Sequence, residues 1–142
     1  MAIWQCDFQL VPSGMAENLE LEDCWAKYSI NKNSLKKLGE VLPDTKSWSE
    51  DIIQYGRNDD TCVQLFCEKS IVVEIRIRIS FRDIDTEKIK AICDFAKHND
   101  GMLYFNKKII LPEMNEIINV IKNSDSSRFC LNPTEYLINL NK

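Results

Sequence analysis

The 142-residue chain has few of the residues that connect or interrupt structure, with only four glycines and four prolines. Flexible linkers are rich in such residues, so we expect a single domain over residues 1–142. No run of about 18 apolar residues occurs, which argues against a membrane-spanning helix. The N-terminus also lacks a basic segment followed by an apolar one, so we expect no secretory signal and a cytoplasmic location.

Histidine is almost missing as well, because His98 is the only one. A Ser–His or Cys–His catalytic arrangement would have to use it. It falls at the end of a predicted helix, a position that histidine favours for its interaction with the helix dipole. No glycine-rich phosphate-binding string occurs either. These absences favour binding over catalysis, and we expect no catalytic residue and no cofactor.

The cysteines form no Cys-x-x-Cys pair of the kind that usually holds zinc. A chain of this length with a normal apolar content does not need disulfides to fold. We therefore expect reduced, mostly buried thiols and no metal site. The six cysteines are Cys6, Cys24, Cys62, Cys67, Cys93 and Cys130.

The clearest pattern lies in residues 71–82, where apolar and polar side chains alternate. A period of two predicts a long strand with one face in the core and the other in water. Arg76, Arg78 and Arg82 share the wet face, which is either a solvated face with ion pairs to Glu68 or Glu74, or a docking surface. No aromatic side chain of this strand joins them, which argues against stacking on nucleic-acid bases.

Alternation and turn residues predict four more strands, at 2–11, 61–67, 102–105 and 109–111. Lys69 and Ser70 would link 61–67 to 71–82 in an antiparallel hairpin. Apolar spacing of three and four, together with capping residues, predicts helices at 34–41, 47–56, 86–98, 112–121 and 133–140. The expected fold is α+β, mainly an antiparallel sheet of about five strands packed with four to five helices.

The helix predicted at 47–56 has the most specific signals. Ser47 and Glu50 match a capping box, and Gly56 suits a helix C-terminus. Trp48 follows the same helical spacing, so we expect it to lie in the core or at its rim, like Trp4 and Trp25.

Charge is distributed unevenly along the chain. Residues 1–60 hold 11 acidic and 6 basic side chains, a balance of −5, whereas residues 61–142 hold 11 and 12, a balance of +1. A net charge of −4 disfavours binding to nucleic acid and suits a basic protein partner. The predicted partner-binding residues are Glu17, Glu20, Glu22, Asp23, Asp59 and Asp60, with Arg76 and Arg78 on the sheet.

Three strings, at 47–56, 74–82 and 124–133, resemble segments of small bacterial proteins of the immunity type that accompany polymorphic toxins and contact-dependent growth inhibition. The resemblance implies a non-enzymatic protein that neutralises a cognate toxin by binding it. It assigns no role to any residue.

Two other hypotheses stay open. One is a small enzyme that uses Asp59, Asp60 and His98, because loop carboxylates can act as acids or bases. The other is a structural protein that self-associates through the arginine face of the 71–82 strand.

Overall fold

The computed structural model describes residues 5–15, 21–82 and 84–123. The elements follow in the order β1 (Gln5–Pro12), η1 (Ser13–Met15), α1 (Lys32–Val41), β2 (Asp44–Thr45), β3 (Ile52–Tyr55), β4 (Cys62–Glu68), β5 (Ile71–Ser80), α2 (Thr86–His98), β6 (Gly101–Phe105), β7 (Lys108–Ile110) and α3 (Met114–Lys122). The predicted α+β fold is confirmed.

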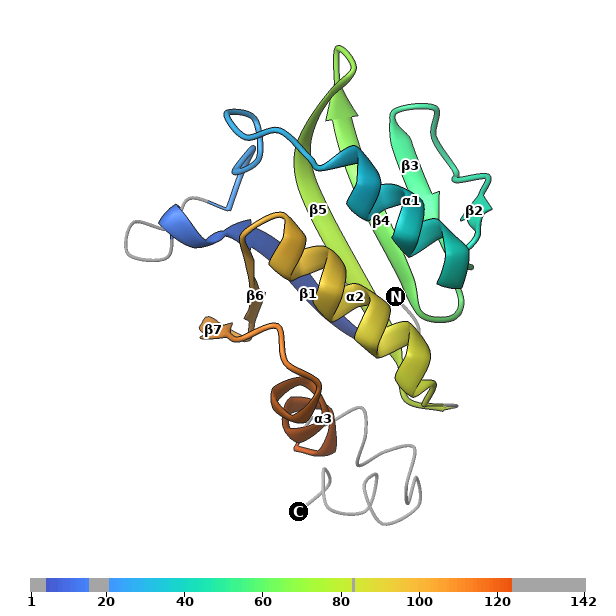
Figure 1. The fold of residues 1–142 in the computed structure, drawn as a ribbon, viewed down its shortest axis with the longest axis vertical. Helices are drawn as coiled ribbons and strands as arrows, with labels where there is room; N and C mark the ends of the chain where they lie inside the picture. The colour runs from blue at the N-terminus through green and yellow to red at the C-terminus, as the bar shows by residue number, and fades with distance from the viewer. Residues whose placement is uncertain (1–4, 16–20, 83, 124–142) are drawn as a thin grey trace, which may run out of the picture.

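All seven strands belong to one antiparallel sheet in the order β2-β3-β4-β5-β1-β6-β7. The sequence predicted about five strands, because it missed β2 and β3. Helices α1 and α2 lie side by side in front of the sheet, and α3 lies beyond the β6–β7 hairpin (Figure 1). The described residues hold three α-helices, fewer than the four to five predicted, and the helix predicted at 133–140 lies outside them.

The core lies between this sheet and the helices. Ile75, Ile77 and Ile79 of β5 have no exposed surface, and β1 places Leu10, Phe8 and Cys6 opposite them in register. The period of two that predicted both strands is therefore confirmed by burial on one face. Ile89 and Ile92 of α2 close the same core from the helix side.

Several local signals also place elements correctly. Asp85 caps α2, because its carboxylate accepts from the backbone N–H groups of Glu87 and Lys88. Lys69 and Ser70 have φ values of 51° and 66°, as a two-residue turn between β4 and β5 requires. Within the described residues, no helix is both long and apolar enough to cross a membrane.

The helix predicted at 47–56 is wrong, because this segment ends in strand β3. Ile52 and Gln54 alternate as buried residues with the exposed Ile53, and β3 pairs with β4 along its length. The hydroxyl of Ser47 does not cap a helix and instead donates to the carbonyl oxygen of Ile52 at 2.7 Å. Pairing with β4 satisfies the backbone of β3 and outweighs the local helical spacing.

The second face of the sheet is only in part the wet surface that was predicted, because Arg76 is exposed on it and forms an ion pair with Glu74 while other polar side chains are buried. Gln5, Gln54 and Gln64 lie on this face with only 1–3% of their surface exposed. Arg76 and Arg78 share it, since they pair in register with Gln9 and Asp7 of β1. This face is therefore a polar layer whose amides are held by hydrogen bonds.

Candidate functional site

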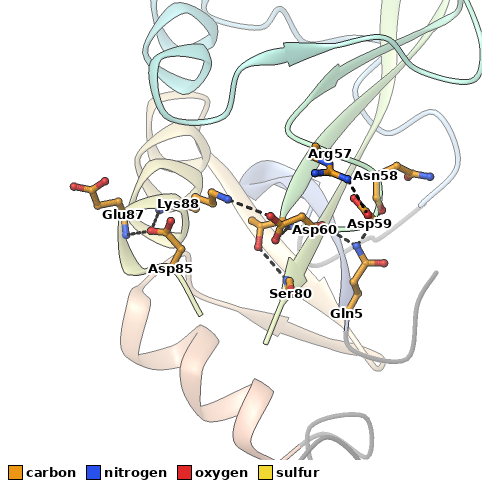
Figure 2. A network of polar contacts seen from close by, with 10 residues as sticks. Gln5, Arg57, Asn58, Asp59, Asp60, Ser80, Asp85, Glu87 and Lys88 are labelled. Atoms are coloured by element: carbon orange, nitrogen blue, oxygen red, sulfur yellow. Dashed lines mark hydrogen bonds and ion pairs between the residues drawn. The ribbon is translucent and has the colours of Figure 1, made fainter. Parts of the chain in front are cut away.

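The segment between β3 and β4, residues 57–60, combines exposed charges with a firmly held backbone, and we call it the 57–60 loop. Gln5 of β1 reaches it from the buried polar layer. Its Nε2 donates to the carbonyl oxygens of Asn58 at 3.1 Å and Asp60 at 2.7 Å, as Figure 2 shows from close by. A buried side chain that satisfies two loop carbonyls fixes the loop backbone to β1.

Side chains of β4 and β5 hold the same loop from beneath. The side-chain oxygen of Asn58 accepts from Arg78 Nη1 at 2.7 Å and from Gln64 Nε2 at 3.3 Å. Asn58 therefore joins the loop to β4, which follows it closely in sequence, and to β5, where Arg78 is 20 residues away.

Asp60 ties the loop to the helix layer. Its Oδ2 lies 3.3 Å from Lys88 Nζ of α2 (Figure 2). Its Oδ1 accepts from the backbone N–H of Thr61 at 2.7 Å. The hydroxyl of Thr61 in turn accepts from the N–H of Ser80 at 3.0 Å. The loop is thus anchored to β1, β4, β5 and α2 together.

The tip of the loop carries charge that these anchors leave at the surface. Arg57 and Asp59 form an ion pair at 3.2 Å, with 76% and 58% of their side chains exposed. An exposed ion pair of this kind contributes little to folding stability. The tip is therefore a charged surface on a rigid support.

Beneath the loop, Asp7 and Arg78 face one another across β1 and β5. Asp7 Oδ1 and Arg78 Nε are buried, and neither has a hydrogen-bond partner among the described residues. Burial raises the pKa of Asp7 above its usual 3.8, and the charges of Arg76 and Arg78 only partly oppose this shift. The polar layer thus holds one carboxyl group whose charged form is disfavoured by burial.

Two other predicted acidic residues, Glu22 and Asp23, belong to the described part of the chain and lie near the C-terminal end of β1. Glu22 and Asp23 are exposed in a turn whose first carbonyl, that of Leu21, accepts from Gln9 Nε2 at 2.8 Å. Gln5 and Gln9 are four residues apart in a strand, or about 13 Å. The structure therefore does not bring Glu22 and Asp23 together with Asp59 and Asp60. Glu17 and Glu20 lie outside the described residues.

Arg76 stands between these two ends. Its Nε lies 3.5 Å from a carboxylate oxygen of Glu74, and its guanidinium lies 5.7 Å from the ring centre of Phe66. Arg78 is likewise bound to Asn58 of the 57–60 loop. Both arginines of the predicted face therefore already make contacts within the protein.

His98 is far from the loop carboxylates. Its Nδ1 lies 2.6 Å from the carbonyl oxygen of Asp94, near the end of α2. Asp60 instead contacts Lys88, ten residues earlier in the helix, which corresponds to about 15 Å. The structure therefore does not assemble Asp60 and His98 into one catalytic arrangement.

The described cysteines are mostly buried, as predicted. Cys6, Cys24, Cys62 and Cys93 are buried, and Cys67 is half-buried. Burial raises the pKa of Cys62 and of Cys93 to about 11, which keeps both thiols protonated at neutral pH. Among the described residues, no group of three or more His, Cys, Asp or Glu side chains is placed to hold a metal ion.

Sequence reasoning missed one surface residue. Trp48 was expected in the core or at its rim, but 74% of its surface is exposed, because the segment that carries it is a loop before β3 and not a helix. Trp25 is fully buried, as predicted, and Trp4 lies outside the described residues. Comparison of the chain with family models, curated proteins and solved structures finds no match.

Proposed function

We propose that this chain is a non-enzymatic protein-binding module of the cytoplasm, and specifically an immunity protein that neutralises a cognate bacterial toxin by binding it. The observation that supports this proposal is the 57–60 loop. Its backbone is anchored by Gln5, Asn58 and Asp60, while the charged side chains of Arg57 and Asp59 point to solvent.

A rigid, charged loop suits binding for a physical reason. Association loses free energy when loops and side chains must be ordered at the interface, and a loop that is already ordered avoids much of that loss. Binding residues are commonly found on loops that a rigid scaffold positions. The anchors of the 57–60 loop therefore favour recognition of a partner over a role in stability alone.

The partner should be a protein with a basic surface. The chain has a net charge of −4, and Asp59, Asp60, Glu22 and Asp23 place acidic groups at both ends of the polar layer. Complementary charge mainly raises the rate of association, which suits an inhibitor that must capture a toxin quickly. The same negative charge repels the phosphates of nucleic acid.

Capture of partners from the native cells tests the proposal, with the tagged full chain at low and at high salt. We expect the wild-type chain to retain one stoichiometric basic protein, whose binding weakens as salt screens the charges. Asp59→Arg should reduce this capture at least several-fold. Asp94→Arg is the matched control, because Asp94 is also exposed but lies in the helix layer, in the groove between α1 and α2.

Loss of capture in both variants, or in neither, would remove the loop from the interface. Capture of no partner by the wild-type chain at either salt would count against a binding module. Sedimentation of the chain at high micromolar concentration would then test self-association through the Arg76 and Arg78 face.

A further inference from the structure

The loop that precedes β3 presents Trp48 to solvent and is held in place by its own hydrogen bonds. Ser47 Oγ lies within hydrogen-bond distance of the carbonyl oxygens of Ser49 and Ile52, which share its one proton, and the N–H of Ile52 donates to the carbonyl of Ser49 at 3.3 Å. The N–H of Asp51 donates to Ser49 Oγ at 3.2 Å. Large aromatic side chains usually stay buried, so an ordered loop that exposes one points to binding.

A hollow of about 370 Å³ lies beside Trp48 at the β2–β3 edge of the sheet. Its apolar lining comes from Trp48, Ile52 and Ile53, and 41% of the surface of Ile53 is exposed. Its acidic lining comes from Asp44 and Glu50, both exposed. The hollow therefore combines an aromatic ring and an aliphatic wall with two carboxylates.

The charge around the hollow selects its occupant. Asp44, Glu50 and the adjacent exposed Asp51 outnumber one basic residue, Lys46. A second copy of this chain would bring the same excess of negative charge, and an anionic lipid surface or nucleic acid would also be repelled. A basic protein partner is the class of ligand that this surface attracts.

We propose that the hollow beside Trp48 binds an arginine or lysine side chain of the protein partner. The aliphatic part of that side chain lies against Ile53, and its cation lies over the Trp48 ring, where the ring quadrupole attracts it. Asp44 and Glu50 then neutralise the cation at the rim of the hollow. This assignment rests on the proposed function, because it takes the ligand from a protein.

A peptide probe tests the hollow without the partner. The full chain is titrated with the acetylated amide of tri-arginine at low salt, and the indole N–H resonance of Trp48 is followed by NMR. Trp48→Phe identifies this resonance by its loss. We expect a saturable shift, and binding about fivefold weaker for the equivalent citrulline peptide, which has the same shape without the charge.

Acidic variants separate this hollow from general charge attraction. Asp44→Asn combined with Glu50→Gln should weaken tri-arginine binding about threefold or more, since each exposed pair contributes a modest amount. Asp94→Gln removes an exposed carboxylate in the α1–α2 groove and should leave binding unchanged. Equal binding of the citrulline peptide, or equal weakening by Asp94→Gln, would overturn the assignment.

The two proposals fail in different ways. If tri-arginine shifts Trp48 as expected but no protein is captured from cells, the hollow stands and the proposed function fails. If a protein is captured but tri-arginine leaves Trp48 unaffected, the hollow is not a cation site. A dimer of the wild-type chain that Trp48→Ser abolishes would assign the hollow to self-association instead.

Discussion

Gly56 offers a sharp test of the strand that replaced a predicted helix. It directly follows β3 with φ at +85°, and its N–H donates to the carbonyl of Pro43 at 2.9 Å. A Cβ placed on Gly56 would collide with the carbonyl oxygen of Thr61 and would lie 3.2 Å from both Cys62 Cα and a methyl carbon of Leu42. Two of these three neighbours are backbone atoms, which cannot move aside as a side chain does.

Gly56→Ala should therefore destabilise the protein by about 3 kcal/mol or more. Holding a non-glycine residue at this φ costs roughly 1–3 kcal/mol, and the forced shift of the Thr61 backbone adds roughly 1–3 kcal/mol. If residues 47–56 formed a helix with Gly56 as its C-terminal cap, the same change would cost only about 1 kcal/mol. The magnitude thus distinguishes the two structures.

Urea unfolding followed by circular dichroism measures this effect. With a slope of about 2 kcal/mol/M, the midpoint should fall by about 1.5 M in Gly56→Ala. Gly39→Ala is the control, because Gly39 lies inside α1 and a Cβ there would meet only the Tyr55 ring, at 3.4 Å. This change should stabilise the protein by about 0.5–1 kcal/mol. A loss below about 1 kcal/mol in Gly56→Ala would refute the steric argument for this strand end.

Three further changes test the polar layer, the tryptophans and the thiols. Because burial raises the pKa of Asp7 in the folded state, its contribution to stability is fully present below pH 3.8 and is lost as the pH rises through the folded-state pKa. Asp7→Asn should therefore stabilise the protein at pH 7 but not at pH 3. Urea unfolding at both pH values measures this difference. Trp48→Ser should change unfolding free energy by less than about 0.5 kcal/mol, whereas Trp25→Ala should cost at least about 3 kcal/mol, by the same assay. Cys62 and Cys93, with pKa values of about 11, should react with iodoacetamide at pH 8 far more slowly than free cysteine, as peptide mass spectrometry of timed samples would show.

Local patterns predicted the elements whose sequence fits one structure only. Alternation in 71–82 and the Asp85 cap each correspond to a single energetic cause, so β5 and α2 appear where they were expected. Segment 47–56 failed because Trp48, Ile52 and Tyr55 fit a helical period, while Ile52 and Gln54 equally fit a buried strand face. Only hydrogen bonds to β4, which lies outside this segment, decide between these patterns.

The candidate site shows the same limit. The charges of Asp59 and Asp60 were visible in the sequence, but the anchor of their loop is Gln5, which is 55 residues from Asp60. A buried glutamine has no distinctive pattern in a sequence, since its hydrogen-bond partners are set by the register of the sheet. The exposure of Trp48 could not be predicted for a related reason. Its segment is a loop and not a helix because the residues that follow it form strand β3.

The 57–60 loop and the hollow beside Trp48 lie at the two ends of β3, so one partner can reach both. From Ser49 to Gly56 the chain advances at most about 24 Å, and an ordinary interface covers about 800 Å² on each partner, a patch roughly 30 Å across. At this separation Asp59 and Trp48 share no contact, so their effects on affinity should add. A captured partner should therefore lose as much binding free energy in the Asp59→Arg, Trp48→Ser double variant as in the two single variants together, within about 0.5 kcal/mol by calorimetry. A double variant that binds as well as either single variant would show that the two features do not act independently in one interface.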